Sequence, residues 1–202
     1  MKGKILHNRF AVLASLVIIA VIAIILYQNF GGYRTLPVIE KAPAFTMKDM
    51  YGQPFSFDKS EGSVRLVSFH YVRCPDVCQT TNLNLIRIQQ KLKEEGVLGK
   101  EADLITITFD PKNDTEDVLQ KYTAARNIQP DGWTFLRGTP QQTKQVLDGF
   151  KLYVQDQGNG LLTHSNELFL VDKERNIRAI YQMGDGMDND RIVEDMLALL
   201  DE

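Results

Sequence analysis

The sequence predicts an α/β domain in which a mixed central sheet carries helices on its faces, preceded by one transmembrane helix. Apolar segments of strand length alternate with amphipathic helical segments from residue 64 onward, and a hairpin-like segment precedes them. Near the N-terminus, an uncharged apolar run extends from Phe10 to Tyr27. With 202 residues, of which 44% are hydrophobic, the chain has room for one domain of ordinary size and an appendage.

The apolar run at residues 10–27 is long enough to span the hydrocarbon of a bilayer with little tilt. Lys2, Lys4 and Arg9 precede it, so the positive-inside rule predicts that residues 1–9 are cytoplasmic and that the domain is exoplasmic. No small-residue cleavage site follows the run, which favours an uncleaved anchor over a signal peptide. The short basic flank lacks the Arg- and Ser-rich stretch of a mitochondrial presequence, so we expect a single-pass protein of a bacterial cell membrane.

The part of the chain after the anchor is predicted to be a tether followed by one acidic domain. Residues 28–42 contain Gly31, Gly32 and Pro37 and show no period, which indicates a tether, and residues 43–202 form the domain. Without the three basic residues that precede the anchor, 20 basic and 26 acidic residues remain, a formal charge of −6. A domain of this charge is a poor partner for nucleic acid.

The first half of the domain begins with a predicted antiparallel hairpin, because residues 45–47 and 54–57 flank the turn signal Tyr51-Gly52. Residues 64–69 have the apolar density of a central strand. A helix follows, because apolar residues recur at three- and four-residue spacing until Gly96: Val77, Thr81, Leu85, Ile88 and Leu92.

The second half continues the alternation of strands and helices. Residues 103–109 predict a strand, and Asp114 or Thr115 can cap the helix after it. Residues 133–136 predict a short strand, and Thr139-Pro140-Gln141-Gln142 has the signature of a capping box at a helix start. The remaining apolar positions predict that helix (Val146, Leu147, Phe150, Val154), two strands (residues 167–171 and 177–181) and a last helix (Ile192, Met196, Leu199, Leu200).

The two cysteines of the chain, Cys74 and Cys78, lie four positions apart where the strand at residues 64–69 gives way to its helix. Two thiols at this junction, with an antiparallel pair of strands late in the chain, are the thioredoxin arrangement, so we predict a thioredoxin-like fold. Two cysteines are too few for a disulfide framework. Three roles remain open for the two cysteines: a redox pair, a metal-binding pair or two unrelated core thiols.

The expected helix start favours reactive thiols. We expect Cys74 at the mouth of the helix, Pro75 in its first turn and Cys78 on the same face, so that both sulfurs reach each other or one ion. The positive end of the helix dipole and the neighbouring Arg73 both favour the thiolate form. A thiolate attacks disulfides and also binds metals, so both functions stay open at this point.

A third ligand would favour metal binding over redox chemistry. His7 precedes the membrane anchor, which leaves His70 and His164. His164 ends a glycine-rich loop that, in a thioredoxin fold, lies beside the cysteines. Two thiolates and one imidazole form a soft, low-coordinate site that suits Cu(I) and takes Cu(II) with a change of geometry, whereas zinc would require a fourth ligand, which water could supply. His70, at a strand end, is expected to be packed or capped.

Four parts of the sequence occur in the order and at the spacings of a known family. They are residues 69–78, residues 110–115, residues 138–140 with their helix, and Thr163-His164 followed by a strand. Across residues 40–202 the chain therefore resembles the Sco/SenC proteins, which assist assembly of cytochrome c oxidase. The specific part is the block Cys-Pro-Asp-Val-Cys with the distant histidine.

The resemblance implies a copper site made by Cys74, Cys78 and His164, with a reversible disulfide between the cysteines when metal is absent. It also implies delivery of copper or electrons to the dinuclear copper centre of oxidase subunit II, with other copper chaperones or thiol reductants as further partners. Asp110 and Asp114 match the family's Asp-Pro-x-x-Asp. Two roles are open for them: a structural one, as a helix cap and a turn beside the site, or a role in docking or metal transfer.

The chain departs from the family at positions that flank the expected ligands. Residues 72–73 are Val-Arg where members commonly show Thr-His, Gln79 stands where a proline often follows the second cysteine, and Thr163 stands where an aspartate often precedes the late histidine. These side chains do not ligate copper, so the departures bear on the choice of partner rather than on the site.

The main alternative function is an exoplasmic thiol:disulfide oxidoreductase that keeps oxidase or cytochrome cysteines reduced. Both functions need Cys74 and Cys78, whereas only copper binding needs His164. A peroxidase would need an arginine and usually a threonine near the reactive thiol, and Arg73 is a weak match for the arginine. We therefore predict a metallochaperone first, with thiol:disulfide exchange as a possible enzymatic activity.

Overall fold

The computed structural model describes residues 12–23, 35–58 and 62–202, in two compact units, Met1–Arg34 and Thr35–Glu202. In the first unit, residues 12–23 are helical. Both ends of the predicted transmembrane helix, residues 10–11 and 24–27, lie outside the described residues. The predicted cytoplasmic segment, residues 1–9, also lies outside them. Among the described residues, no helix combines the length and the apolar character needed to cross a membrane.

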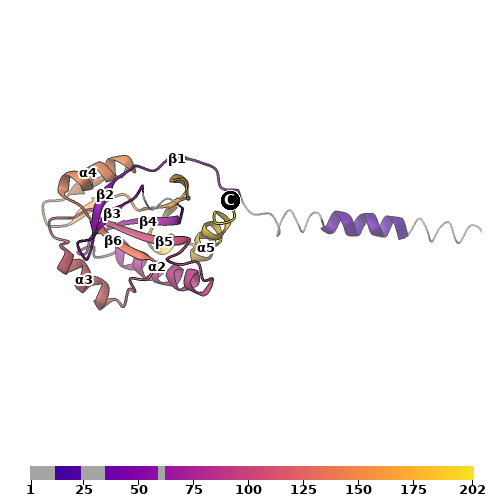
Figure 1. Ribbon diagram of the computed structural model, residues 1–202, viewed down its shortest axis with the longest axis horizontal. Helices are drawn as coiled ribbons and strands as arrows, with labels where there is room; N and C mark the ends of the chain where they lie inside the picture. Colours follow the sequence, from indigo (N-terminus) through magenta and orange to yellow (C-terminus); the bar gives the residue numbers. More distant parts are fainter. Residues whose placement is uncertain (1–11, 24–34, 59–61) are drawn as a thin grey trace, which may run out of the picture. The chain divides into compact units, whose positions relative to one another are not determined.

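In the second unit, eight described strands form one mixed sheet, which confirms the predicted mixed α/β sheet of the domain (Figure 1). The pairings β4–β5 and β5–β6 are parallel and the others are antiparallel. In spatial order the strands are β1 (Glu40–Lys41), β10 (Asn176–Gln182), β9 (Glu167–Val171), β4 (Val64–His70), β5 (Ala102–Thr108), β6 (Trp133–Arg137), β2 (Thr46–Asp49) and β3 (Pro54–Ser56).

The central strand β4 is buried along its whole length, as the apolar density of residues 64–69 predicts. Among its polar residues, Ser68 is accommodated because its hydroxyl pairs with Thr106 Oγ1 of β5 at 2.7 Å. Trp133 of β6 in turn donates its indole N–H to the same Thr106 oxygen at 2.8 Å. The three parallel strands are thus joined through their side chains as well as through their backbones.

Helices cover both faces of the sheet: α2 (Val77–Glu94), α3 (Glu116–Ala125), α4 (Pro140–Gly149) and α5 (Asn189–Ala198). Neighbouring residues of a strand point to opposite faces. Phe69 packs on Phe150 at the end of α4, with ring centroids 5.2 Å apart, and His70 packs on Tyr122 of α3 at 5.3 Å. Figure 1 accordingly shows α4 on one side of the strands and α2 and α3 on the other.

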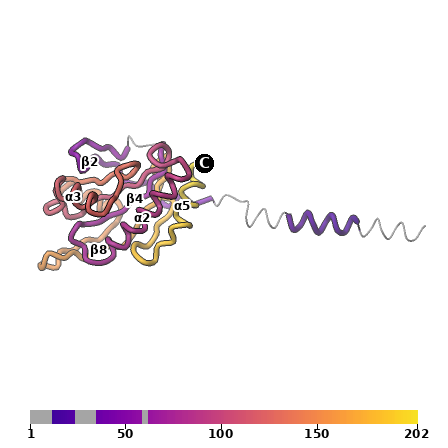
Figure 2. Tube along the Cα trace, turned by 90° about the horizontal axis from the view of Figure 1, so that it is seen from below, coloured from indigo at the N-terminus to yellow at the C-terminus, as the bar shows by residue number. Residues whose placement is uncertain are grey.

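The helix α4 is shorter than the sequence predicted, and a hairpin follows it. The apolar stripe was expected to continue to Val154, but the helix ends at Gly149 and Val154 begins a strand. Strands β7 (Val154–Asp156) and β8 (Leu162–His164) pair with each other in a separate two-stranded sheet. In Figure 2 the tip of this hairpin, drawn in orange, projects from the body of the domain.

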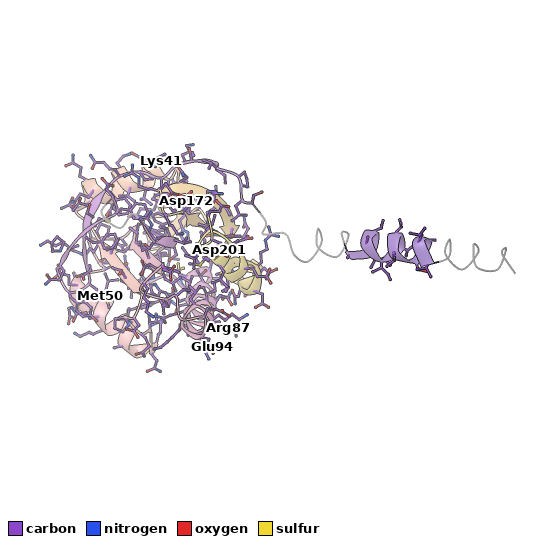
Figure 3. The ribbon with its side chains drawn as sticks, turned by 45° about the vertical axis from the view of Figure 1, so that its right-hand side comes forward. Lys41, Met50, Arg87, Glu94, Asp172 and Asp201 are labelled. Carbon is purple, nitrogen blue, oxygen red and sulfur yellow. The ribbon has the colours of Figure 1, made fainter. Side chains whose placement is uncertain are left out.

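Residues 35–42, which the sequence analysis assigned to the tether, lie on the sheet. Leu36 and Ala42 are buried, and β1 pairs with β10. Arg178 of β10 donates its Nε–H to the Leu36 carbonyl at 3.0 Å. Figure 3 labels Lys41 of β1 and Asp172 beyond β9 on the same side of the domain. The predicted tether therefore remains a prediction for residues 28–34, which lie outside the described residues.

Candidate metal centre

The loop between β4 and α2 presents the first thiol. Strand β4 ends at His70, a turn closes where Cys74 N donates to the Tyr71 carbonyl at 3.1 Å, and α2 begins at Val77 with Asp76 as its N-cap. The expected position of Pro75 in the first helical turn is wrong, because the helix begins two residues later. Cys74 therefore lies in the loop and Cys78 in the first turn of the helix.

The third residue of the cluster comes from the end of the hairpin. His164 is the last residue of β8, not a loop residue as expected. One ligand atom from each of Cys74, Cys78 and His164 lies within 4.8 Å of the others. Cys78 is fully buried, Cys74 is 4% exposed and His164 is half-buried. The structure thus brings together the three residues that the sequence selected.

The His164 ring is oriented by its neighbours so that one nitrogen is available. Its Nδ1 lies 2.8 Å from the Ser165 carbonyl, which can only accept a hydrogen bond, so Nδ1 carries the proton. The lone pair of the neutral ring is then on Nε2, the tautomer that a metal ligand needs. Phe109 and Tyr71 flank the ring, with centroids 4.8 Å and 6.0 Å from it.

The two thiols differ strongly in their acidity. The hydrogen bond from Cys78, above all, lowers the pKa of Cys74 to about 4, with further hydrogen bonds from His164 and from the backbone N–H groups of Asp76 and Cys78. The same hydrogen bond to Cys74 raises the pKa of Cys78, and burial and the adjacent Cys74 charge raise it further. The pair is therefore one thiolate at Cys74 and one thiol at Cys78.

The imidazole responds to the neighbouring thiolate. Burial acts to lower the pKa of His164, but the hydrogen bonds to Cys74 and to the Ser165 carbonyl outweigh it, so the pKa is raised. A cavity of about 420 Å³ opens onto the cluster between the start of α2 and the hairpin, lined among others by Pro75, Asp76 and Leu161. Cys74 and His164 line this opening, whereas Cys78 lies behind it.

Two sulfur donors and one imidazole nitrogen fit copper better than harder metals. Thiolate is a soft ligand that selects Cu(I), and an imidazole suits copper in either valence. Zinc in a structural site is held by four protein ligands, and the cluster of described residues supplies three. Binding a cation would also compensate the charge of Cys74 and would draw the proton from Cys78.

His70 is a core residue and is not part of the cluster, in agreement with the expectation from sequence. Its ring stacks edge-on against Tyr122 and Phe135, and neither ring nitrogen has a hydrogen-bond partner among the described residues. Burial, with a smaller contribution from the charge of Arg126, lowers the pKa of His70 to about 3. The ring is neutral and serves packing.

Asp114 is neither a helix cap nor a ligand. It is fully buried, and Val72 N and Thr108 Oγ1 donate to its carboxylate, while Thr115 caps α3. Asp114 therefore ties the loop that carries Cys74 to the end of β5.

Arg73 was expected to favour the thiolate of Cys74, but the groups that lower the pKa of Cys74 are Cys78, His164 and the backbone N–H groups of Asp76 and Cys78. Arg73 pairs with Asp110 at 3.0 Å, so its charge is compensated there. Sequence reasoning did not find Tyr71 and Phe109 as the rings that flank His164, because nothing in their spacing separates them from core residues.

The comparisons with known proteins agree with this geometry. The sequence model of the SCO1/SenC family matches residues 35–201. The chain is 33% identical over 137 residues to an SCO2-like protein of Rickettsia prowazekii, a match that covers 64% of this chain and 63% of the relative. The chain thus spans less than two thirds of that relative's length.

Two solved structures show the same fold. BsSco, described as a member of the Sco family of cytochrome c oxidase assembly proteins with a disulfide switch, superposes with a TM-score of 0.74 at 23% identity, covering 84% of this chain and 99% of BsSco. Yeast Sco1 with copper bound superposes with a TM-score of 0.67 at 23% identity, covering 81% of this chain and 90% of the yeast chain. At this identity the superpositions establish the thioredoxin-type fold of the Sco proteins.

Proposed function

The chain belongs to the SCO1/SenC family, and from this premise we propose that it binds copper through Cys74, Cys78 and His164 and acts in the assembly of cytochrome c oxidase. The observation that carries the proposal is the cluster itself, in which two sulfurs and an imidazole nitrogen lie within 4.8 Å of one another. Three donors of this kind at one opening suit a protein that must take up a soft cation and release it again.

The finer part of the proposal concerns the acceptor and the location. We propose delivery of copper to the dinuclear centre of oxidase subunit II, with other copper chaperones or thiol reductants as further partners. We also propose that residues 10–27 anchor the chain in a bacterial cell membrane with the domain on the exoplasmic side. Lys2, Lys4 and Arg9 before the apolar run support this orientation.

The experiment is a titration of the full chain with Cu(I) under reducing conditions, in competition with a chromogenic chelator. We expect one ion per chain, loss of binding in Cys74→Ser and Cys78→Ser, and an affinity at least tenfold to hundredfold weaker in His164→Ala, because losing a group that only orients a ligand already costs about that much. Binding that survives both serine substitutions would overturn the proposal.

His70→Phe is the matched control for the His164 substitution. It removes an imidazole elsewhere while keeping an aromatic ring against Tyr122 and Phe135. Because the His70 nitrogens have no hydrogen-bond partner among the described residues, the change removes no bond of that kind. We expect its copper affinity to equal that of the unaltered chain.

A second candidate function is thiol:disulfide exchange, and the asymmetry of the thiols favours it. An attacking thiolate at Cys74 beside a buried thiol at Cys78 is the arrangement that such a reaction requires. The His164→Ala variant separates the candidates: a copper-binding protein loses affinity, whereas an oxidoreductase keeps its rate of disulfide reduction. Retained copper affinity in His164→Ala, together with an unchanged rate of disulfide reduction, would favour the second candidate.

A further inference from the structure

His164 is carried by a part of the domain that does not belong to the main sheet. Cys74 and Cys78 lie on the β4–α2 junction, whereas β7 and β8 pair only with each other in the described sheets. A two-stranded hairpin is at best marginally stable by itself. The position of the imidazole relative to the sulfurs therefore depends on contacts between the hairpin and the rest of the domain.

One such contact is made by Tyr71, three residues before Cys74. Its buried phenolic oxygen accepts a hydrogen bond from Leu162 N of β8 at 3.3 Å, and its ring lies edge-on to His164. This bond is long for an N–H donor and oxygen acceptor. It holds β8 at its first residue, which pairs with Asp156 where the turn of the hairpin begins and ends.

The tip of the hairpin lies against Arg73. A Cβ atom added at Gly160 would lie 3.3 Å from Arg73 Nη1, so the guanidinium is packed against the backbone there. On its other side, Arg73 Nη2 donates to Asp110 Oδ2 at 3.0 Å. Asp110 is buried and is itself held by Asn113 Nδ2, at 2.8 Å and 2.9 Å. The arginine thus stands between a fixed carboxylate and the hairpin.

We propose that Arg73 is a positioning residue, which braces the hairpin at Gly160 against Asp110 and so keeps His164 within reach of Cys74 and Cys78. It acts on metal binding through His164 and not through its charge, because Asp110 neutralises that charge. Loss of the brace leaves both sulfurs in place and increases the fraction of molecules in which the imidazole is displaced. The part of this inference that concerns copper rests on the proposed function, whereas the brace itself exists in the metal-free protein.

The first measurement is amide hydrogen exchange of the metal-free full chain. We expect Arg73→Gln to speed exchange across residues 154–164, including Leu162, by about 1.5-fold to fivefold, the range for losing a partly exposed ion pair. Protection in α2 should not change. Lys121→Gln, which removes the cation of an exposed pair with Asp117, is the charge-loss control and should leave the hairpin unaffected.

Two glycines of the same loop provide a matched pair for the contact itself. Gly158 and Gly160 both have left-handed backbones, with φ of +77° and +82°, so alanine is strained at either position. A Cβ at Gly158 meets no atom within 4 Å, whereas at Gly160 it meets Arg73. We expect Gly160→Ala to open the hairpin more than Gly158→Ala, and equal effects would contradict the brace.

The second measurement is a double-substitution cycle with Cu(I) affinity as its readout. Arg73→Gln should weaken binding by about 1.5-fold to fivefold in the unaltered chain, Arg73→Lys by less, and neither should weaken it further once His164→Ala is present. An equal loss in both backgrounds, or unchanged hairpin exchange in Arg73→Gln, overturns the inference. If the unaltered chain binds no copper, the proposed function fails, and the exchange experiments still decide whether Arg73 is a brace.

Discussion

Cys74 and Cys78 are chemically different because the backbone places them differently. Cys74 lies in the loop, where His164 and two backbone N–H groups approach its sulfur, whereas Cys78 is enclosed in the first turn of α2. One thiolate is therefore ready for a cation before any proton is lost. The second sulfur gives up its proton only when a metal ion or an oxidant engages the pair.

At the scale of single residues, the sequence was sufficient to identify the three residues of the cluster but not the contacts that hold them in place. The spacing of Cys74 and Cys78 and the place of His164 before a late strand select the three residues. The direction of Arg73 could not be predicted, because Cys74 and Asp110 both attract a guanidinium and only the folded loops determine which one is nearer. The neutral state of His70 likewise depends on burial between rings that lie far apart in the sequence.

Asp114 gives a prediction for the pH dependence of stability. Burial, acting against the hydrogen bonds from Thr108 and Val72, raises its pKa to about 6 from the ordinary value near 3.8. Between these values the folded state holds a proton that the unfolded state releases, so stability falls as the pH rises. Between pH 4.5 and pH 7, the titration of Asp114 should lower the free energy of unfolding by on the order of 2 kcal/mol. We expect Asp114→Asn to abolish this decrease.

Urea unfolding of the metal-free chain at pH 4.5 and pH 7 measures the slope of the free energy of unfolding against pH. The control is Asp117→Asn, because that carboxylate lies on the exposed face of α3 in an i,i+4 pair with Lys121. The control should retain the slope of the unaltered chain. An unchanged slope in Asp114→Asn would show that another group is responsible.

At the scale of elements, prediction succeeded where a local signal existed. The strand β4 was found from its apolar run, and the start of α4 was found because Thr139, Pro140 and Gln142 each favour it, as the complete capping box confirms. The hairpin was missed because β7 and β8 have three residues each, with no alternating apolar pattern. Because of Gly158 and Gly160, the whole segment before His164 was predicted to be a loop, and the strands on either side of the glycines were not predicted.

The capping box of α4 gives a prediction for one element. Thr139 Oγ1 accepts from Gln142 N at 3.2 Å, and Gln142 Oε1 accepts from Thr139 N at 2.9 Å. Thr139→Ala should therefore lower the free energy of unfolding by about 1 kcal/mol, whereas Thr139→Ser should keep most of it. Chemical denaturation compares the two, and equal losses would mean that the hydroxyl does not cap the helix.

At the scale of the whole domain, the layers were predictable and the edges of the sheet were not. Alternating strands and helices define a mixed sheet with two covered faces, as found. The edge strand β1 has two residues, too few for any pattern, and it is a strand because β10 offers it partners. The predicted hairpin of β2 and β3 also joins the main sheet, through pairing of β2 with β6.

The packing of residues 35–42 predicts where the domain can be shortened. A chain that begins at Thr35 keeps Leu36, β1 and the bond from Arg178 to the Leu36 carbonyl. A chain that begins at Pro43 loses them, and the loss of buried Leu36 alone should cost about 1.5–3 kcal/mol. Urea unfolding should give a clearly lower midpoint for the shorter chain, and equal midpoints would place the boundary of the domain at residue 43.

The central claim is that His164 and both cysteines hold a single copper ion together. X-ray absorption at the copper edge, on the full chain loaded with one equivalent of Cu(I), tests it most directly. We predict scattering from two sulfurs and one imidazole, with the imidazole contribution absent in His164→Ala and unchanged in His70→Phe. A sulfur-only spectrum that is the same in the unaltered chain and in His164→Ala would contradict the claim.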